Sequence, residues 1–160
     1  MDKKNILSIK NLKKIYLSKQ SGDTHALNNL NLDVQEGEIF GLLGPNGAGK
    51  TTFINIVAGT VIKTAGQVNV YGFDLDKNPR QVRASVGIVP QEINLDPFFS
   101  PRKLLDLQAG LYGIKKKNRI TDTILKLVSL EKQANSYARS LSGGMKRRLL
   151  MAKALVHQPP

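Results

Sequence analysis

The sequence predicts an α/β fold in which a β-rich N-terminal part, a glycine-rich loop and a helical C-terminal part follow one another. Three observations support this prediction. Stretches rich in Ile, Leu and Val over residues 5–17 and 30–43 predict strands joined by a polar loop. A glycine loop at 44–51 lies between an apolar run and a helical pattern. From Pro97 onward the apolar residues recur at helical spacing.

The N-terminal part contains further predicted elements around the glycine loop. The short apolar run 39–43 suits a strand buried on both faces, and so does 86–89, which Pro90 ends. The other elements are a turn at 36–38, a helix over 51–58 closed by Gly59, and an alternating strand over 66–71.

Three helical patterns fill the C-terminal part. Leu104, Leu107 and Leu111 share one helical face. Four residues of a second pattern do the same, and a last helix runs from about residue 143 to residue 156. The members of the second pattern are Ile120, Ile124, Leu127 and Val128.

Composition narrows the class of protein. The 160 residues are 41% apolar and 22% charged, as in one globular domain. No apolar run approaches the roughly 18 residues of a membrane span, and the N-terminus lacks the apolar stretch of a signal peptide. The absence of cysteine excludes disulfides, thiolate zinc sites and cysteine nucleophiles. His25 and His157 lack metal-ligand spacing, and we expect both at the surface. A soluble, cytosolic protein fits these observations.

The net charge of +12 is unevenly distributed. Residues 1–96 hold 11 basic and 9 acidic side chains, whereas residues 97–160 hold 13 basic and 3 acidic ones. Few aromatic residues of the kind that stack on bases lie among the basic ones. We therefore expect a solvated helix face, or a face that meets acidic groups, rather than a nucleic-acid partner.

The glycine loop G-x-x-x-x-G-K-T at 44–51 carries specific chemistry. Glycines let successive backbone N–H groups point inward around phosphate oxygens, and the following helix adds its positive dipole end. Lys50 offers a cation to the β- and γ-phosphates, and Thr51 offers a hydroxyl to Mg²⁺. We predict a nucleotide site rather than a plain turn before a helix. Its residues are Gly44, Pro45, Asn46, Gly47, Ala48, Gly49, Lys50, Thr51 and Thr52.

A second motif, Leu-Ser-Gly-Gly-Met, opens the last helical pattern. Its serine is a strong N-cap candidate, and the two glycines leave backbone N–H groups unobstructed. The three basic residues 146–148 then fall in the first turns, where the dipole disfavours each cation by about 0.3–1 kcal/mol. An anion nearby would remove this conflict, although a plain capped surface helix is the alternative. The motif consists of Leu141, Ser142, Gly143, Gly144 and Met145.

With Tyr16 and Gln91 in their places along the chain, these motifs make the sequence resemble the ATP-binding cassette of ABC transporters. Val-Pro-Gln-Glu at 89–92 and the methionine form of the second motif are similar to ATP-binding subunits of ABC-2-type exporters. The resemblance implies an α/β fold with a P-loop NTPase (RecA-like) core, an ABC-type antiparallel β flank and an α-helical subdomain, incomplete at the C-terminus. It further implies one partial ATP-binding domain over 1–160: the β flank and nucleotide-binding core over 1–91, the helical subdomain over 92–140, and the signature helix over 141–160.

The resemblance also implies roles for single residues. Tyr16 would stack on adenine, although the sequence alone equally allows a strand residue that packs on its neighbours. Gln91 would be the catalytic glutamine that reaches Mg²⁺ and the attacking water, with a polar strand terminus as the alternative; Thr51 would be the second metal ligand. The turn at 141–145 would press on the γ-phosphate held by a partner subunit. Met145 cannot return the capping-box bond of the commoner glutamine, which predicts a slightly looser turn.

For the whole protein, the resemblance implies an ATP hydrolase that uses Mg²⁺ and works as a head-to-tail homodimer or with a paired ATP-binding subunit. It would couple ATP hydrolysis to export through a separate membrane-spanning permease, on the cytoplasmic face of the membrane. Two alternatives stay open: a soluble ABC ATPase acting on ribosomes or nucleic acid, and a truncated nucleotide-binding remnant. The sequence of this chain does not identify the transported substrate.

Two catalytic elements of the family are not found in the sequence. They are an apolar strand ending in Asp-Glu, which helps to hold Mg²⁺ and activates water, and a later histidine at the γ-phosphate. The run 104–107 is too short to be that strand and lies in a helical pattern. The family places the strand just after the segment matching 156–160. We therefore expect an N-terminal fragment that alone binds ATP weakly, hydrolyses little or none, and aggregates through exposed apolar edges.

Overall fold

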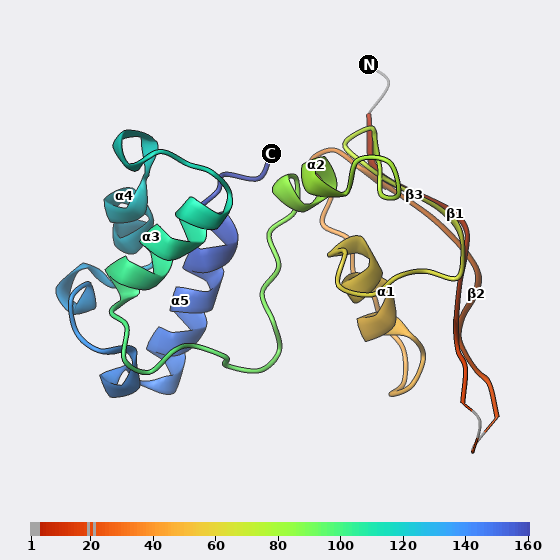
Figure 1. Ribbon diagram of the computed structural model, residues 1–160, viewed down its shortest axis with the longest axis horizontal. Coiled ribbons are helices and arrows are strands. Elements are labelled where there is room, and N and C mark those ends of the chain that lie inside the picture. Colours follow the sequence, from red (N-terminus) through yellow and green to blue (C-terminus); the bar gives the residue numbers. More distant parts are fainter. Residues whose placement is uncertain (1–3, 19, 21) are drawn as a thin grey trace. The chain divides into compact units, whose positions relative to one another are not determined.

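The computed structural model describes residues 4–18, 20 and 22–160 (Figure 1). The chain divides into two compact units: the first ends at Ser85, and the second runs over Val86–Pro160. A four-stranded sheet and two helices form the first unit, and the second unit is helical. Among the described residues, none of the helices combines the length and the apolar character needed to cross a lipid bilayer.

The sheet of the first unit is antiparallel throughout, in the order β2-β1-β3-β4. Strands β1 and β2 form a long pair that runs from Asn5 opposite Gln35 to Tyr16 opposite Thr24. This sheet confirms the predicted antiparallel β flank, although the second strand begins and ends earlier than the predicted 30–43. The strands are β1 (Asn5–Tyr16), β2 (Thr24–Gln35), β3 (Ala65–Val70) and β4 (Phe73–Asp74).

Two helices accompany this sheet. Helix α1 (Lys50–Val57) contacts β2, and α2 (Pro79–Ala84) contacts β4. Phe53 and Ile56 of α1 are buried, as the predicted apolar stripe requires. Burial of one helical stripe therefore holds in place the helix that the glycine loop opens.

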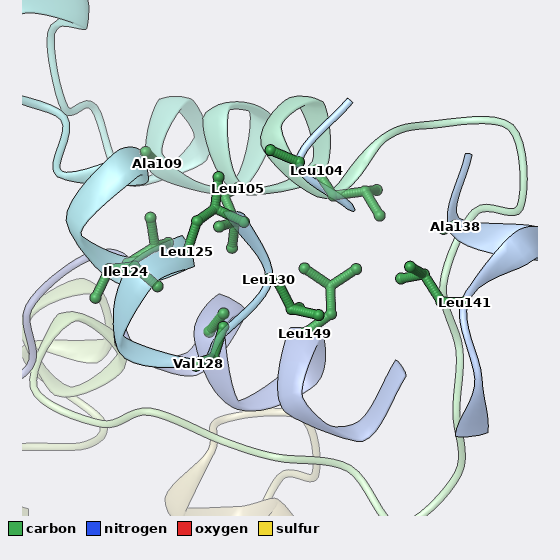
Figure 2. Close-up of a cluster of buried hydrophobic side chains, with 13 residues drawn as sticks. Leu104, Leu105, Ala109, Ile124, Leu125, Val128, Leu130, Ala138, Leu141 and Leu149 are labelled. Carbon is green, nitrogen blue, oxygen red and sulfur yellow. The ribbon is translucent and has the colours of Figure 1, made fainter. Parts of the chain in front are cut away.

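The second unit is built from three helices and short 3₁₀ turns. The helices are α3 (Pro101–Leu111), α4 (Thr121–Leu127) and α5 (Gly143–Leu155). The turns are Lys116–Asn118, Glu131–Gln133 and Ala138–Ser140. Helix α3 contacts both α4 and α5, and their apolar side chains form one buried cluster (Figure 2). Its members include Leu104, Leu105, Ala109, Ile124, Leu125, Val128, Leu130, Leu141, Leu149, Ala152 and Val156.

Two predicted strands are wrong. Residues 39–43 and 86–89 are not strands, and the sheet of the described residues includes neither segment. Ile39 is 100% exposed and Leu43 is 93% exposed, so the run 39–43 is not buried on both faces as predicted. An apolar run becomes a strand only when a neighbouring strand takes up its backbone hydrogen bonds.

The predicted apolar faces of two helices are also partly wrong. In α3 the buried residues are Pro101, Leu104, Leu105 and Ala109, whereas Leu111 is 83% exposed. In α4, Leu125 is buried and Leu127 lies in solvent, while Ile124 and Val128 are buried as predicted. Each helix has two overlapping apolar faces, and the packing of the neighbouring helices decides which face is buried. The sequence of one helix does not show which of the two faces this is.

Candidate nucleotide-binding site

The glycine loop precedes α1 directly, as predicted. Gly47 and Gly49 both adopt the left-handed backbone conformation, with φ of 83° and 88°. Between them the loop turns sharply, and the N–H of Ala48 donates to the carbonyl of Pro45 at 3.3 Å. The left-handed conformation is the one in which glycine avoids the steric penalty that other residues incur.

Gly49 is required for a second reason, the close approach of β2. A Cβ atom at this position would lie 2.3 Å from the carbonyl oxygen of Ala26 and 2.8 Å from the side chain of Leu27. At Gly47 an added Cβ would meet nothing within 4 Å. The two glycines therefore differ: Gly47 serves the turn alone, and Gly49 also lets the start of α1 pack against the sheet.

The first turn of α1 offers backbone N–H donors. No side chain caps this end, and no acidic residue lies in the first turn. The bond from Phe53 N to Gly49 O, at 2.8 Å, is the first along the helix. The N–H groups of Lys50, Thr51 and Thr52 precede it, at the positive end of the helix dipole. Such an end favours an anion such as a phosphate.

The Lys50 ammonium group lies over the loop that precedes it. Its Nζ donates to the carbonyl of Gly44 at 2.6 Å and to that of Pro45 at 2.7 Å. An ammonium group has three N–H donors, so it can hold the loop and still reach an anion. The hydroxyl of Thr51 is on an exposed residue at the same helix end. A cation, a hydroxyl and a row of amides form a donor set that fits a phosphate group with Mg²⁺.

Tyr16 ends β1 and is 41% exposed. The Lys14 ammonium lies 4.6 Å from the ring centroid, over the aromatic face. This is the geometry of a cation–π contact. The ring is therefore a partly exposed platform with a lysine over one face, rather than a buried strand residue.

The Ser-Gly-Gly turn opens α5 as predicted. Ser142 is the N-cap, and its Oγ accepts from the N–H of Met145 at 3.3 Å. Gly143 and Gly144 are exposed, and a Cβ at either would meet nothing within 4 Å. Leu141 is buried in the core cluster. The buried leucine thus anchors the turn, and the two glycines present their backbone to solvent.

Met145 packs against the same core cluster. It does not make the reciprocal bond of a capping box, but its side chain provides an apolar contact instead. The prediction of a looser turn at this position stays a prediction.

The segment that carries Gln91 contacts α5. The guanidinium of Arg147 donates to the backbone carbonyl of Gln91, and its Nη1 lies 3.5 Å from that of Pro90. Gln91 itself is exposed. The sequence indicated an anion near the basic residues of α5; for Arg147 the compensating groups are backbone carbonyls. Sequence reasoning missed this contact, which joins residues 56 positions apart.

His25 is exposed as expected, whereas His157 is only partly exposed. The ring of His157 stacks on Tyr112 with centroids 3.9 Å apart, and Nε2 lies 3.1 Å from the carbonyl of Val86. Burial lowers the pKa of His157, and the hydrogen bond to Val86 opposes this shift. No local signal in the sequence could have placed this ring.

The candidate residues fall into two sets. The loop residues 44–52 and Tyr16 belong to the first unit, and Gln91 with the turn at 141–145 belongs to the second. A glycine loop for phosphate followed in one chain by a serine-capped Gly-Gly turn is the arrangement of an ATP-binding cassette. Residues 27–160 match the family described as ABC transporter, and the chain belongs to that family.

Similar proteins of known name are export ATP-binding proteins of this family. The chain is 42% identical over 143 residues to the Nod factor export ATP-binding protein I of Cupriavidus pinatubonensis, covering 88% of this chain and 44% of that protein. It is 40% identical over 157 residues to the protein of the same name in Cupriavidus metallidurans, covering 96% and 50%. The chain therefore spans about half the length of the curated relatives it matches.

Solved structures agree with the fold. An ATP-binding subunit of an ABC transporter matches with a TM-score of 0.81 at 26% identity, over 97% of this chain and 63% of that one. A dimeric ATP-binding cassette in a post-hydrolysis state, bound to ADP and Pi, matches with a TM-score of 0.80 at 28% identity, over 96% and 71%. These likenesses confirm the predicted α/β cassette fold.

Proposed function

We propose that this chain is part of the ATP-binding subunit of an ABC exporter. The observation that carries the proposal is the opening of α1, where Gly49 brings the helix N-terminus against the sheet and Lys50 lies over the loop. The names of the relatives, which are export ATP-binding proteins, support the same branch.

In this proposal the first unit binds the nucleotide. The backbone N–H groups of residues 46–52 surround the β- and γ-phosphates, and the Lys50 ammonium neutralises part of their charge. The Tyr16 ring stacks on adenine with the face that Lys14 leaves open. Each of these groups acts by binding and orienting the substrate.

Mg²⁺ fits the donor set of the loop, where Thr51 would hold it through the hydroxyl. The resemblance to ABC cassettes implies Gln91 as a further ligand, through its side-chain carbonyl. The ion would supply positive charge that neutralises part of the phosphate charge. Gln91 would also orient the attacking water by a hydrogen bond.

The second unit serves the partner subunit. The turn Leu141–Met145 presents the N–H groups of Gly143 and Gly144 at a helix N-terminus, which suits an anion held by another subunit. The solved dimeric cassette supports such a pairing. We propose a head-to-tail dimer, either of identical chains or with a paired ATP-binding subunit.

For the whole protein we propose ATP hydrolysis coupled to export through a separate membrane-spanning permease. It would act at the cytoplasmic face of the membrane. Residues 1–91 would form the β flank and nucleotide-binding core, 92–140 the helical subdomain, and 141–160 the signature helix. The division into two units at residues 85 and 86 lies near the first of these boundaries.

The Lys50→Met variant tests the nucleotide site. We expect its affinity for MgATP to fall by about 10- to 100-fold, because hydrogen bonds to charged groups contribute about 1.5–3 kcal/mol. Isothermal titration calorimetry of the full natural protein measures this. Lys10→Met, which removes the same charge from an exposed position on β1, should bind MgATP as the wild type does. Equal weakening in both variants would show that net charge, not the loop, attracts the nucleotide.

A further inference from the structure

The segment that leads to Gln91 runs beside α5 and contacts the helix, or the residue His157 just after its end, at three points. At one end, the carbonyl of Val86 lies 3.1 Å from His157 Nε2. Next along the segment, Gly87 lies against Ala154, where an added Cβ would be 2.3 Å from the carbonyl oxygen. At the other end, Arg147 donates to the carbonyl of Gln91. The order of the contacts shows that the segment and the helix run in opposite directions.

Of the residues in these contacts, Arg147 lies nearest in sequence to the Ser142 turn, and it bonds Gln91 directly. It is the fifth residue of α5, whose N-cap is Ser142. A cation so close to a helix N-terminus is disfavoured by the dipole, and two backbone carbonyls offset that cost. A single nitrogen of its guanidinium, Nη1, is the donor to both carbonyls, and the group stays charged at every physiological pH.

We propose that Arg147 is a positioning residue that holds Gln91 at a fixed distance from the Ser142 turn. The proposal rests on the function proposed above, in which Gln91 reaches Mg²⁺ and the turn meets the partner's nucleotide. Because one helix carries both the serine cap and the arginine, a displacement of the turn is passed directly to the backbone of Gln91. Arg147 thereby links the approach of the partner subunit to the placement of the metal ligand.

The Arg147→Gln variant of the full natural protein, assayed with its membrane partner, tests this role. We expect kcat for ATP hydrolysis to fall about 10-fold and the Mg²⁺ concentration for half-maximal rate to rise severalfold. The Kd for ATP without Mg²⁺ should stay within twofold, since Arg147 does not belong to the unit that carries the loop. Arg147→Lys should recover part of the rate. Lys126→Gln, which removes an exposed charge from α4, is the matched control and should leave all values unchanged.

A double-mutant cycle with Gln91→Ala separates positioning from general stabilisation. If Arg147 acts through Gln91, then Arg147→Gln should change kcat less than twofold in the Gln91→Ala background. An equal loss in both backgrounds overturns the proposal, and so does a wild-type Mg²⁺ dependence in Arg147→Gln. If Arg147→Gln fails to fold, Arg147→Lys in the same cycle decides by the same criterion. A wild-type protein that neither binds nor hydrolyses ATP would instead refute the proposed function.

Discussion

Lys50 and Arg147 are both cations near a helix N-terminus, and backbone carbonyls compensate the charge of each. Each cation lies in the first turns of a helix, where the dipole disfavours positive charge. Each side chain donates to two carbonyls of a preceding segment: Gly44 and Pro45 for Lys50, and Pro90 and Gln91 for Arg147. In both cases the compensation also fixes the loop that carries those carbonyls. Lys50 thereby orders the loop directly before its own helix, and Arg147 orders a segment 56 positions away in the chain.

His157 makes the stability of the second unit depend on pH. Its Nδ1 is buried and finds no hydrogen-bond partner in the described part of the chain, so protonation there would create an unpaired donor. Burial accordingly lowers the pKa of His157 below its ordinary value of 6.5. The folded unit then binds fewer protons than the unfolded chain, and the free energy of unfolding decreases as the pH falls through 6.5.

Urea unfolding followed by circular dichroism checks this prediction. We expect a lower midpoint at about pH 5.5 than at about pH 7.5, the two sides of the ordinary histidine pKa. His157→Phe keeps a ring to stack on Tyr112 and should lose most of the difference, whereas His25→Phe should retain it. The same pH dependence in both variants would assign the effect to other groups.

At the scale of the element, two helices of the second unit begin with the same cap. Ser100 opens α3 and Ser142 opens α5, and in each the Oγ accepts from a backbone N–H at 3.3 Å. Loss of a serine cap costs about 0.5–2 kcal/mol. The two serines therefore make equivalent caps, but only Ser142 belongs to the turn that we propose contacts ATP.

We expect Ser100→Ala and Ser142→Ala to reduce the free energy of unfolding by similar amounts, about 1 kcal/mol each. Only Ser142→Ala should also weaken ATP-dependent dimerisation. Urea unfolding and analytical ultracentrifugation with and without ATP measure the two effects. Dimerisation that weakens equally in both variants would mean that stability alone accounts for it.

Elements that depend on local chemistry could be predicted from the sequence. The cap at Ser142 and the loop-to-helix junction at Lys50 follow from residue types a few positions apart. The strands predicted at 39–43 and 86–89 failed because strand formation depends on a distant neighbour. The exposed Leu111 was misassigned for a related reason, since the burial of a helical face is decided by other helices.

At the scale of the whole molecule, the candidate site was predictable as a set of motifs but not as a set of contacts. The loop residues and the Ser-Gly-Gly turn carry their chemistry in their spacing. The bond between Arg147 and Gln91, the stack of His157 on Tyr112, and the approach of Gly49 to Ala26 join residues far apart in the chain. Only the folded chain brings such pairs together.

The exposed run 39–43 has a consequence for how chains interact in solution. Ile39 and Leu43 offer apolar surface for association, while a net charge of +12 makes the chains repel one another. Raising the ionic strength from about 0.01 M to about 0.15 M shortens the screening length from about 30 Å to about 8 Å. We expect the weight-average mass of the 160-residue chain, measured by light scattering, to rise with salt.

The double variant Ile39→Ser/Leu43→Ser should stay monomeric over the same range, and a mass that falls with salt would contradict the prediction. In that case the repulsion between positively charged chains keeps them from associating. Buffers of low ionic strength should then keep the chain monomeric better than buffers of high ionic strength.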